Sequence, residues 1–277
     1  MKPNLLIKSL LGAIILTLLT MVFTEIMSSS HHMSYYLWSI PANFLVSLVL
    51  GYYIIHSTYN GFKLCANVLM VYFIIGFLNI MIEALIFNVS DRVETINSLI
   101  GGLFLTLLYS PLYVYVLGRW KSQSVPISFQ PRSLFGWIWK ITITDLLYFV
   151  VYMMAGLTLI AVYPELIDFY EDKVPAFDLI FKTQLFRGLI FAGIALLVLR
   201  TTDLPPLKAA LLIGAIFSVL GGIAPLIPPN ELMPPNIRLA HSFEVGISNF
   251  VYGIIAGYLL KQKFAAEVTP PSVSKGA

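Results

Sequence analysis

The chain of 277 residues is 58% hydrophobic and only 11% charged, and its formal net charge is +3. Soluble domains are about 45–50% apolar and about 25% charged, so this composition excludes an ordinary soluble fold and indicates a lipid bilayer. The single cysteine, Cys65, excludes an intramolecular disulfide and a multi-cysteine metal site, and the modest charge gives no reason to expect a nucleic-acid partner.

Eight mainly apolar runs follow one another along the chain. A membrane-spanning helix needs about 20 such residues, and the runs lie at 5–27, 36–56, 62–88, 97–118, 135–163, 178–200, 207–228 and 237–261. We therefore predict an all-α fold, a polytopic transmembrane helical bundle of about eight helices in a single domain (1–263). A disordered cytoplasmic tail is expected at 264–277. We find no internal repeat when the two halves are compared by eye.

The first run also has features of a signal peptide, namely a basic start, an apolar core and small residues. Its apolar core is long, and the stretch 24–27 is a poor approach to a cleavage site. We therefore favour an uncleaved first helix. Cleavage would leave seven spans and would not change how the others face.

Basic residues set the orientation of a multipass protein, because Lys and Arg collect on the cytoplasmic side. With the N-terminus inside, the outer side has only Arg92, Lys173 and Arg238, while most acidic residues outside the spans gather there. We predict that both termini are cytoplasmic and that the protein lies in a bacterial cytoplasmic (inner) membrane, with the lipid bilayer as its surroundings.

Polar residues lie on one face of the third and sixth spans. In the third span, Asn79 and Glu83 are four residues apart, and Glu83 lies near the outer end. In the sixth, Arg187 lies roughly 13 Å below the outer end, and Gln184 is one turn nearer to the surface. Charged groups in the bilayer are costly, so they face the bundle interior and find partners.

The eighth span brings a third set of polar groups to the same half of the membrane. His241, Glu244 and Asn249 belong to a stripe that descends from the outer surface towards the midplane. We therefore expect Arg187 to pair with Glu83 or Glu244 in an outward-facing pocket. A buried ion-pair network that only fixes the helix register is the alternative.

One acidic residue of the fifth span lies elsewhere. Asp145 is about ten residues from the cytoplasmic end of its span, too deep to reach the inner surface. We interpret it as a candidate inner gate or proton site. A hydrogen bond to a neighbouring helix is the other interpretation.

A metal or haem site has little support in the sequence. His241 and Glu244 lie three residues apart, and Glu83 could supply a third ligand for an open metal site. However, no His-Glu-x-x-His motif occurs, a lone His-x-x-Glu is a weak signal, and His241 is the only embedded candidate for an axial haem ligand. We expect no metal and no cofactor.

The stretch "KTQLFRGLIFAG" resembles the first motif of the CAAX-type prenyl endopeptidases, in which two glutamates precede an arginine and a glycine. Those are eight-helix intramembrane enzymes whose glutamates and later histidines build the catalytic centre. Here Lys182 and Thr183 stand at the glutamate positions, and Gly221 stands where a histidine would follow Phe217. The resemblance therefore implies at most a distant, non-proteolytic relative.

A second segment, "MPPNIRLAHSFEVGISNFVYG", is similar to C-terminal segments of uncharacterised bacterial multipass membrane proteins. That resemblance implies no activity. Small residues four apart, Gly253 with Gly257 and Ser218 with Gly222, favour close helix packing and also allow a homo-oligomer through those faces.

We expect the pocket to bind or move a small solute, an ion or a lipid headgroup. Arg187 and His241 would contact the anionic part of this ligand, while Glu83 or Glu244 would hold Arg187 or carry a proton. We assign no catalytic residue. The alternatives are a membrane-embedded, hydrolase-like enzyme with His241 or Glu244 as acid–base, and a non-catalytic structural or partner subunit.

The orientation makes a direct prediction. In a Cys65→Ala background, Ser90→Cys and Glu171→Cys should react with an impermeant maleimide added to intact cells, because both lie in outer loops. Ser122→Cys should react only after the cells are opened. Labelling of Ser122→Cys from outside, or protection of the other two, would overturn the topology.

Overall fold

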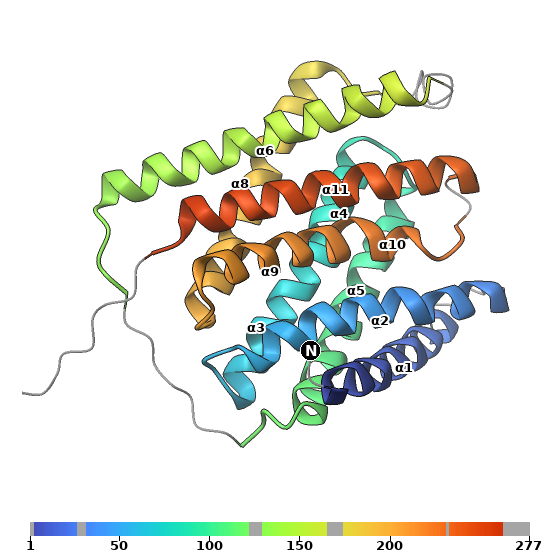
Figure 1. Cartoon of the computed structure of the whole chain (residues 1–277). Coiled ribbons are helices and arrows are strands. Elements are labelled where there is room, and N and C mark those ends of the chain that lie inside the picture. The colour runs from blue at the N-terminus through green and yellow to red at the C-terminus, as the bar shows by residue number, and fades with distance from the viewer. Residues whose placement is uncertain (1–2, 27–31, 122–128, 165–173, 231–232, 263–277) are drawn as a thin grey trace, which may run out of the picture.

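A computed structural model describes residues 3–26, 32–121, 129–164, 174–230 and 233–262, and this part of the chain is nearly all helical (Figure 1). Eight of its helices are long and apolar enough to cross a membrane. Large apolar side chains such as Ile7, Phe62 and Phe135 point outwards from the bundle. The prediction of an all-α, multipass membrane protein is therefore confirmed.

The elements follow the expected order, and two spans are interrupted. They are α1 (Pro3–Ile26), α2 (Met33–Ile55), α3 (Gly61–Phe73) with η1 (Ile74–Leu78) and α4 (Asn79–Ile86), α5 (Arg92–Val116), α6 (Leu134–Val162), α8 (Phe177–Thr201), α9 (Pro206–Ser218) with η2 (Val219–Ile223) and α10 (Ala224–Leu226), and α11 (Pro235–Leu260). The elements η1 and η2 are single π-helical turns inside otherwise α-helical spans. The tail predicted at 264–277 lies outside the described residues.

Helix α5 begins at Arg92, earlier than the expected residue 97, and its cap explains the difference. The carboxylate of Asp91 accepts hydrogen bonds from the backbone N–H groups of Val93 (2.8 Å) and Glu94 (3.3 Å). Such a cap satisfies N–H groups that have no partner inside the helix, and its negative charge is favourable at that end. The polar start of this span is therefore helical although it is not apolar.

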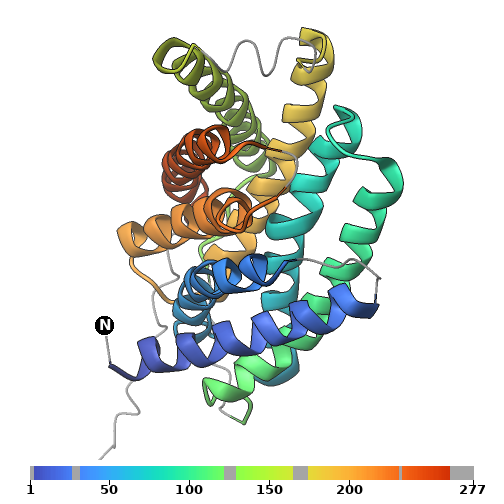
Figure 2. The same ribbon diagram turned by 90° about the vertical axis from the view of Figure 1, so that its right-hand side faces the viewer.

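The helices form two layers of three spans each, and one further span closes each edge between the layers. One layer places α11, α9 and α2 side by side, and the other places α8, α3 with α4, and α5 (Figures 1 and 2). Helix α6 packs against α11 and α8 at one edge, and α1 packs against α2 and α5 at the other. The eight spans thus close into a flattened ring, with the two π-helical turns in contact at its centre.

The two halves of the chain repeat the same order of elements. A helix of 13 residues followed by a π-helical turn of 5 residues occurs at Gly61–Leu78 and again at Pro206–Ile223. The packing repeats too: α2 contacts α10 as α8 contacts α4, and α3 contacts α5 as α9 contacts α11. The repeat is therefore one of element order and packing, and it is not visible when the two halves of the sequence are compared by eye. The halves run parallel, because corresponding spans are an even number of spans apart.

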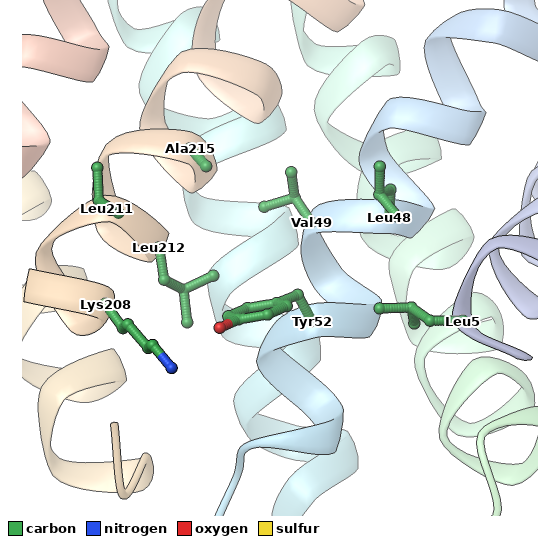
Figure 3. Close-up of a pocket in the computed structure, with 8 residues that line it drawn as sticks. All are labelled: Leu5, Leu48, Val49, Tyr52, Lys208, Leu211, Leu212 and Ala215. Carbon is green, nitrogen blue, oxygen red and sulfur yellow. The ribbon is translucent and has the colours of Figure 1, made fainter. Parts of the chain in front are cut away.

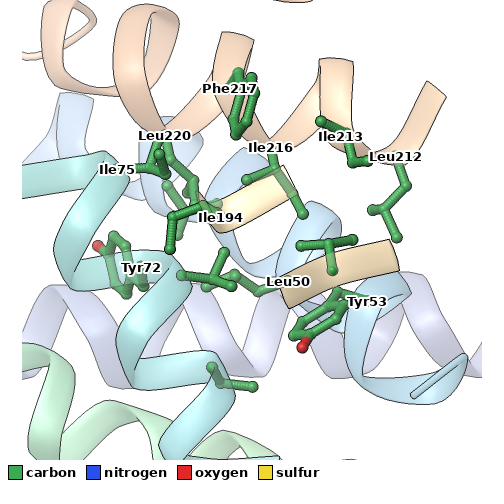
Figure 4. Packing of buried hydrophobic residues seen from close by; sticks show 14 of the residues in the cluster. Leu50, Tyr53, Tyr72, Ile75, Ile194, Leu212, Ile213, Ile216, Phe217 and Leu220 are labelled. Atoms are coloured by element: carbon green, nitrogen blue, oxygen red, sulfur yellow. The ribbon is translucent and has the colours of Figure 1, made fainter. Parts of the chain in front are cut away.

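The core lies where the layers meet. Leu50 and Tyr53 of α2, Ile194 of α8 and the two π-helical turns pack together there (Figure 4). Ile75 of η1 and Leu220 of η2 are almost fully buried. The two turns therefore form part of the contact between the halves.

Helices α9 and α11 approach closely because small residues face each other. A Cβ on Gly253 would lie 2.6 Å from Cα of Gly214, and a Cβ on Gly257 would lie 2.6 Å from Cα of Ala210. The same holds for Gly222, where a Cβ would meet the backbone of Gly246 at 3.2 Å. The small-residue faces thus contact each other inside one chain. A homo-oligomer, which stays a prediction, would need other faces.

This contact predicts opposite effects for two glycines in helices. Gly253→Ala should lower the melting temperature of the purified protein in detergent, because overpacking against backbone costs about 1–3 kcal/mol. Gly193→Ala is the matched control: nothing lies within 4 Å of its Cβ position, so the better helix propensity of Ala should leave stability unchanged or raised. Equal shifts for the two variants would contradict the close α9–α11 contact.

Candidate functional site

Arg187 lies on the buried face of α8, near the middle of the span. Only 6% of the residue is exposed, and Gln184, one turn earlier, is fully buried. Side chains in a helix lean towards its N-terminus, and the guanidinium accordingly reaches back to Gln184, with Nη1 donating to Oε1 at 2.9 Å. The arginine therefore points towards the predicted outer side.

The guanidinium is held by an acidic residue of α4. Nη1 of Arg187 lies 2.5 Å from Oε2 of Glu83, and the side-chain exposures are 7% and 26%. Nε2 of Gln184 donates to Oε1 of Glu83 at 3.1 Å. Of the two acidic partners considered for Arg187, the structure gives it Glu83, and Gln184 bonds both members of the pair.

Asn79 joins this group where η1 ends and α4 begins. Nε of Arg187 donates to Oδ1 of Asn79 at 3.4 Å, and Asn79 is fully buried. Its Nδ2 has no hydrogen-bond partner within the described ranges. The residue that follows the π-helical turn thus bonds the arginine through its side-chain oxygen, while its side-chain N–H donors have no partner among the described residues. Glu83, Asn79, Gln184 and Arg187 are called the arginine network below.

Two tyrosines of α6 contact the arginine network, and the sequence analysis did not predict these contacts. The hydroxyl of Tyr152 donates to Oε1 of Glu83 at 3.2 Å. The ring of Tyr148 lies with its centroid 5.9 Å from the guanidinium carbon of Arg187, which is cation–π range. The signal for them was the spacing of Asp145, Tyr148 and Tyr152 on one face of the fifth span.

His241 and Glu244 of α11 pair with each other. Nδ1 of His241 lies 2.8 Å from Oε2 of Glu244, with side-chain exposures of 27% and 13%. No hydrogen bond or ion pair joins this pair to Arg187 or Glu83 in the described part of the chain. By helical spacing they share a face with Tyr252, whose ring packs edge-on against Tyr148 at 5.0 Å. The pair is a separate polar group on the neighbouring helix.

Asn249 of α11 bonds the backbone of the seventh span. Its Nδ2 donates to the backbone oxygens of Phe217 (3.3 Å) and Gly221 (3.4 Å). These carbonyls border and belong to η2, where a π-helical turn shifts the backbone pattern. The side chain therefore supports the interrupted backbone of the seventh span. As a member of a binding site it stays a prediction.

Asp145 lies against Gly188, beside the arginine network. A Cβ on Gly188, the residue after Arg187, would be 2.2 Å from Oδ1 of Asp145. That oxygen and the hydroxyl of Tyr252 are buried without a hydrogen-bond partner among the described residues. Polar groups therefore continue inwards from the network. The assignment of Asp145 as an inner gate stays a prediction.

Two cavities in the described part of the chain lie elsewhere. One, of about 240 Å³, is apolar and lies between α1, α2 and α9, with Lys208 and Tyr52 in its lining (Figure 3). The other, of about 450 Å³, lies among the segments around Arg132 and Arg200. Neither is lined by the arginine network. Among the described residues, no three His, Cys, Asp or Glu side chains gather to hold a metal ion.

Comparisons with protein-family models, curated proteins and solved structures find no match for this chain. The resemblance of "KTQLFRGLIFAG" to the CAAX-type motif stays a prediction. In the structure, the Phe186–Gly188 part of this stretch belongs to a helix whose arginine is bound to Glu83. The chain is a multipass membrane protein, and its function has to be argued from its own residues.

The ion pair makes a prediction about stability. Arg187→Ala should lower the melting temperature in detergent more than Arg187→Met. Removing one partner of a buried pair costs about 3–5 kcal/mol, and alanine adds a void that methionine largely fills. Adding Glu83→Gln to Arg187→Met should recover part of the loss, because no buried charge is then left alone.

The control for this series is the exposed pair of Lys182 and Asp178 on the same helix, 2.9 Å apart. Lys182→Met should leave the melting temperature unchanged, since exposed pairs contribute little. If Arg187→Ala and Arg187→Met both behave like Lys182→Met, the arginine is solvated and the network does not hold it.

Proposed function

We propose that this membrane protein binds and moves a small anionic group through the arginine network, carried by a solute, an ion or a lipid headgroup. The observation that supports the proposal most is that the network occupies only one of two corresponding interfaces. Helix α8 meets α4 through Arg187 and Glu83. The shift along the chain that aligns Gly61 with Pro206 aligns Arg187 with Ala42 of α2. The corresponding interface of α2 with α10 therefore packs without an ion pair among the described residues.

The counterparts of Glu83 and Asn79 in the second half strengthen the argument. The same shift along the chain aligns Glu83 with Pro228 and Asn79 with Ala224, a buried alanine in α10. The counterparts of Arg187, Glu83 and Asn79 are thus alanine or proline, and only Gln184 has a polar counterpart, Ser39. Since buried charges are costly in a bilayer, an ion pair kept at one interface and absent from its counterpart favours a ligand over a structural role.

The arrangement suggests how an anion would bind. An anionic group that enters from the outer side would take the place of Glu83 on the guanidinium of Arg187. Glu83 would then be a carboxylate without a cation in a low-dielectric site, so it would take up a proton as it is released. Tyr152 and Gln184, which already bond Glu83, would hold it in either state. The proposal thus couples anion binding to a proton.

The His241–Glu244 pair supports a second candidate, a membrane-embedded enzyme with this pair as acid–base. A carboxylate that bonds one ring nitrogen orients a histidine, as general acid–base catalysis requires. Arg187 does not contact the pair, however, so an oxyanion group for it is not in place. The structural or partner-subunit reading would explain the arginine network only as a register device.

Accessibility separates a ligand site from a sealed structural network. In a Cys65→Ala background, Gln184→Cys should react slowly with an impermeant cationic methanethiosulfonate added to intact cells, because a site that exchanges its ligand must open to the outside. Ser39→Cys is the matched control: it occupies the corresponding position of the first half and is also buried, with 4% exposed. Equal protection of both cysteines would show that the network is sealed.

Movement is tested in proteoliposomes with pyranine inside and succinate, glutamate or phosphate outside as probes. Wild-type protein should acidify the interior with at least one of these anions. Arg187→Met should abolish the signal, and Lys182→Met should keep it. If Gln184→Cys is accessible but no probe moves protons, binding without transport is the better description.

A further inference from the structure

The basic residues at the predicted cytoplasmic end of the bundle cap the end of α11. Arg132 donates to the backbone oxygens of Leu260 (3.4 Å) and Lys261 (2.9 Å), and Nζ of Lys140 donates to that of Leu259 at 2.7 Å. The last carbonyls of a helix have no partner inside it, and cations are favourable there. These contacts fix α11 against the start of α6.

Beside this cap lies the polar cavity of about 450 Å³. Its lining comes from four separate segments and includes Tyr59, Gln130, Arg132, Trp137, Arg200 and Gln262. Nε2 of Gln262 donates to the backbone oxygen of Gln130 at 3.1 Å, which ties two of these segments together. The volume is that of a small-molecule site, for which about 300–1,000 Å³ is usual.

The charge of the cavity is positive and has no acidic counterpart in its lining. The guanidinium carbons of Arg132 and Arg200 lie 4.4 Å and 5.3 Å from the ring centroid of Trp137, so one indole holds both cations. Within the described ranges Arg200 has no ion pair, and no Asp or Glu lines the cavity. Burial lowers the pKa of Arg132, as expected for a cation without a counter-charge.

The donors match one kind of ligand best. Guanidinium groups offer planar pairs of N–H donors that fit phosphate oxygens, and a side-chain amide and a tyrosine hydroxyl add neutral donors. We expect the cavity to lie at the membrane surface, because Leu134 and Phe135, at the start of α6 nearby, are 77% and 78% exposed, as lipid-facing residues would be. Basic pockets between spans on the cytoplasmic side bind anionic lipid headgroups.

We propose that this cavity binds a phosphate group, supplied by an anionic phospholipid of the inner leaflet, through Arg200 and Arg132. The site is distinct from the arginine network, with which it shares no residue. It lies against the ends of α6, α8 and α11, so a bound headgroup would link these three helices. The proposal does not depend on what the arginine network binds.

The test uses the purified full-length protein in detergent. Phosphatidylglycerol added stepwise should raise the melting temperature in a saturable way, and phosphatidylcholine at the same concentrations should not. Arg200→Gln should weaken the apparent affinity for phosphatidylglycerol about tenfold, because it removes a charged phosphate contact. Arg200 is chosen for substitution because Arg132 also bonds the backbone oxygens at the end of α11. The variant Arg200→Lys keeps the charge and should keep part of the affinity, which would show that the protein tolerates a substitution at this position.

The matched control is Lys63→Gln, which removes the same charge from an exposed residue on the same predicted side, outside the cavity. It should leave the phosphatidylglycerol response unchanged. A further arm adds glycerol phosphate without lipid: saturation with the same dependence on Arg200, and no further effect of lipid, would assign the phosphate to a soluble compound. Equal responses to both lipids, or equal effects of Arg200→Gln and Lys63→Gln, would overturn the proposal.

Discussion

Hydrocarbon offers a polar group no hydrogen-bond partner, and much of this structure follows from that constraint. Every span in the described residues is helical, and several hydroxyls inside the spans bond backbone oxygens of their own helix, as Thr106 does to Gly102 at 2.9 Å. Where η2 interrupts a span, Asn249 donates to the carbonyls of Phe217 and Gly221. Asn79 lies at the corresponding interruption and binds Arg187 instead. The amide of Asn249 thus bonds backbone oxygens at an interruption, and the amide of Asn79 bonds a buried cation.

The repeat separates what the fold requires from what it does not. Both halves have the π-helical turn, both pack the fourth span of the half against the third, and both place their second span against the other half. Only the second half has an arginine in that second span, and only the first half has Glu83 to meet it. The packing shared by the two halves therefore does not require the Arg187–Glu83 pair, although its charges are costly to bury.

The sequence predicted the spans and the depth of charged residues within them well. It predicted less well which neighbouring helix each side chain meets. The spans, and an ion pair of Arg187 with an acidic residue of the same half of the membrane, follow from hydropathy and from the cost of burying charge. Periodicity gives the face of a helix but not the neighbouring helix that this face meets, so it did not show that Tyr152 meets Glu83. The π-helical turns were not predictable, because "IIGFL" and "VLGGI" fit an α-helix equally well.

The repeat was missed for a related reason. Apolar residues exchange freely on buried surfaces, so two halves can keep one packing pattern while few residues match. What the halves share is geometry, namely a π-helical turn after 13 helical residues. That geometry has a consequence for Arg187. Asn79 follows η1, and η1 contacts η2 of the other half, so the amide that bonds the guanidinium lies beside the contact between the halves. If the proposed function holds, binding at Arg187 would be linked to movement of one half against the other through this amide.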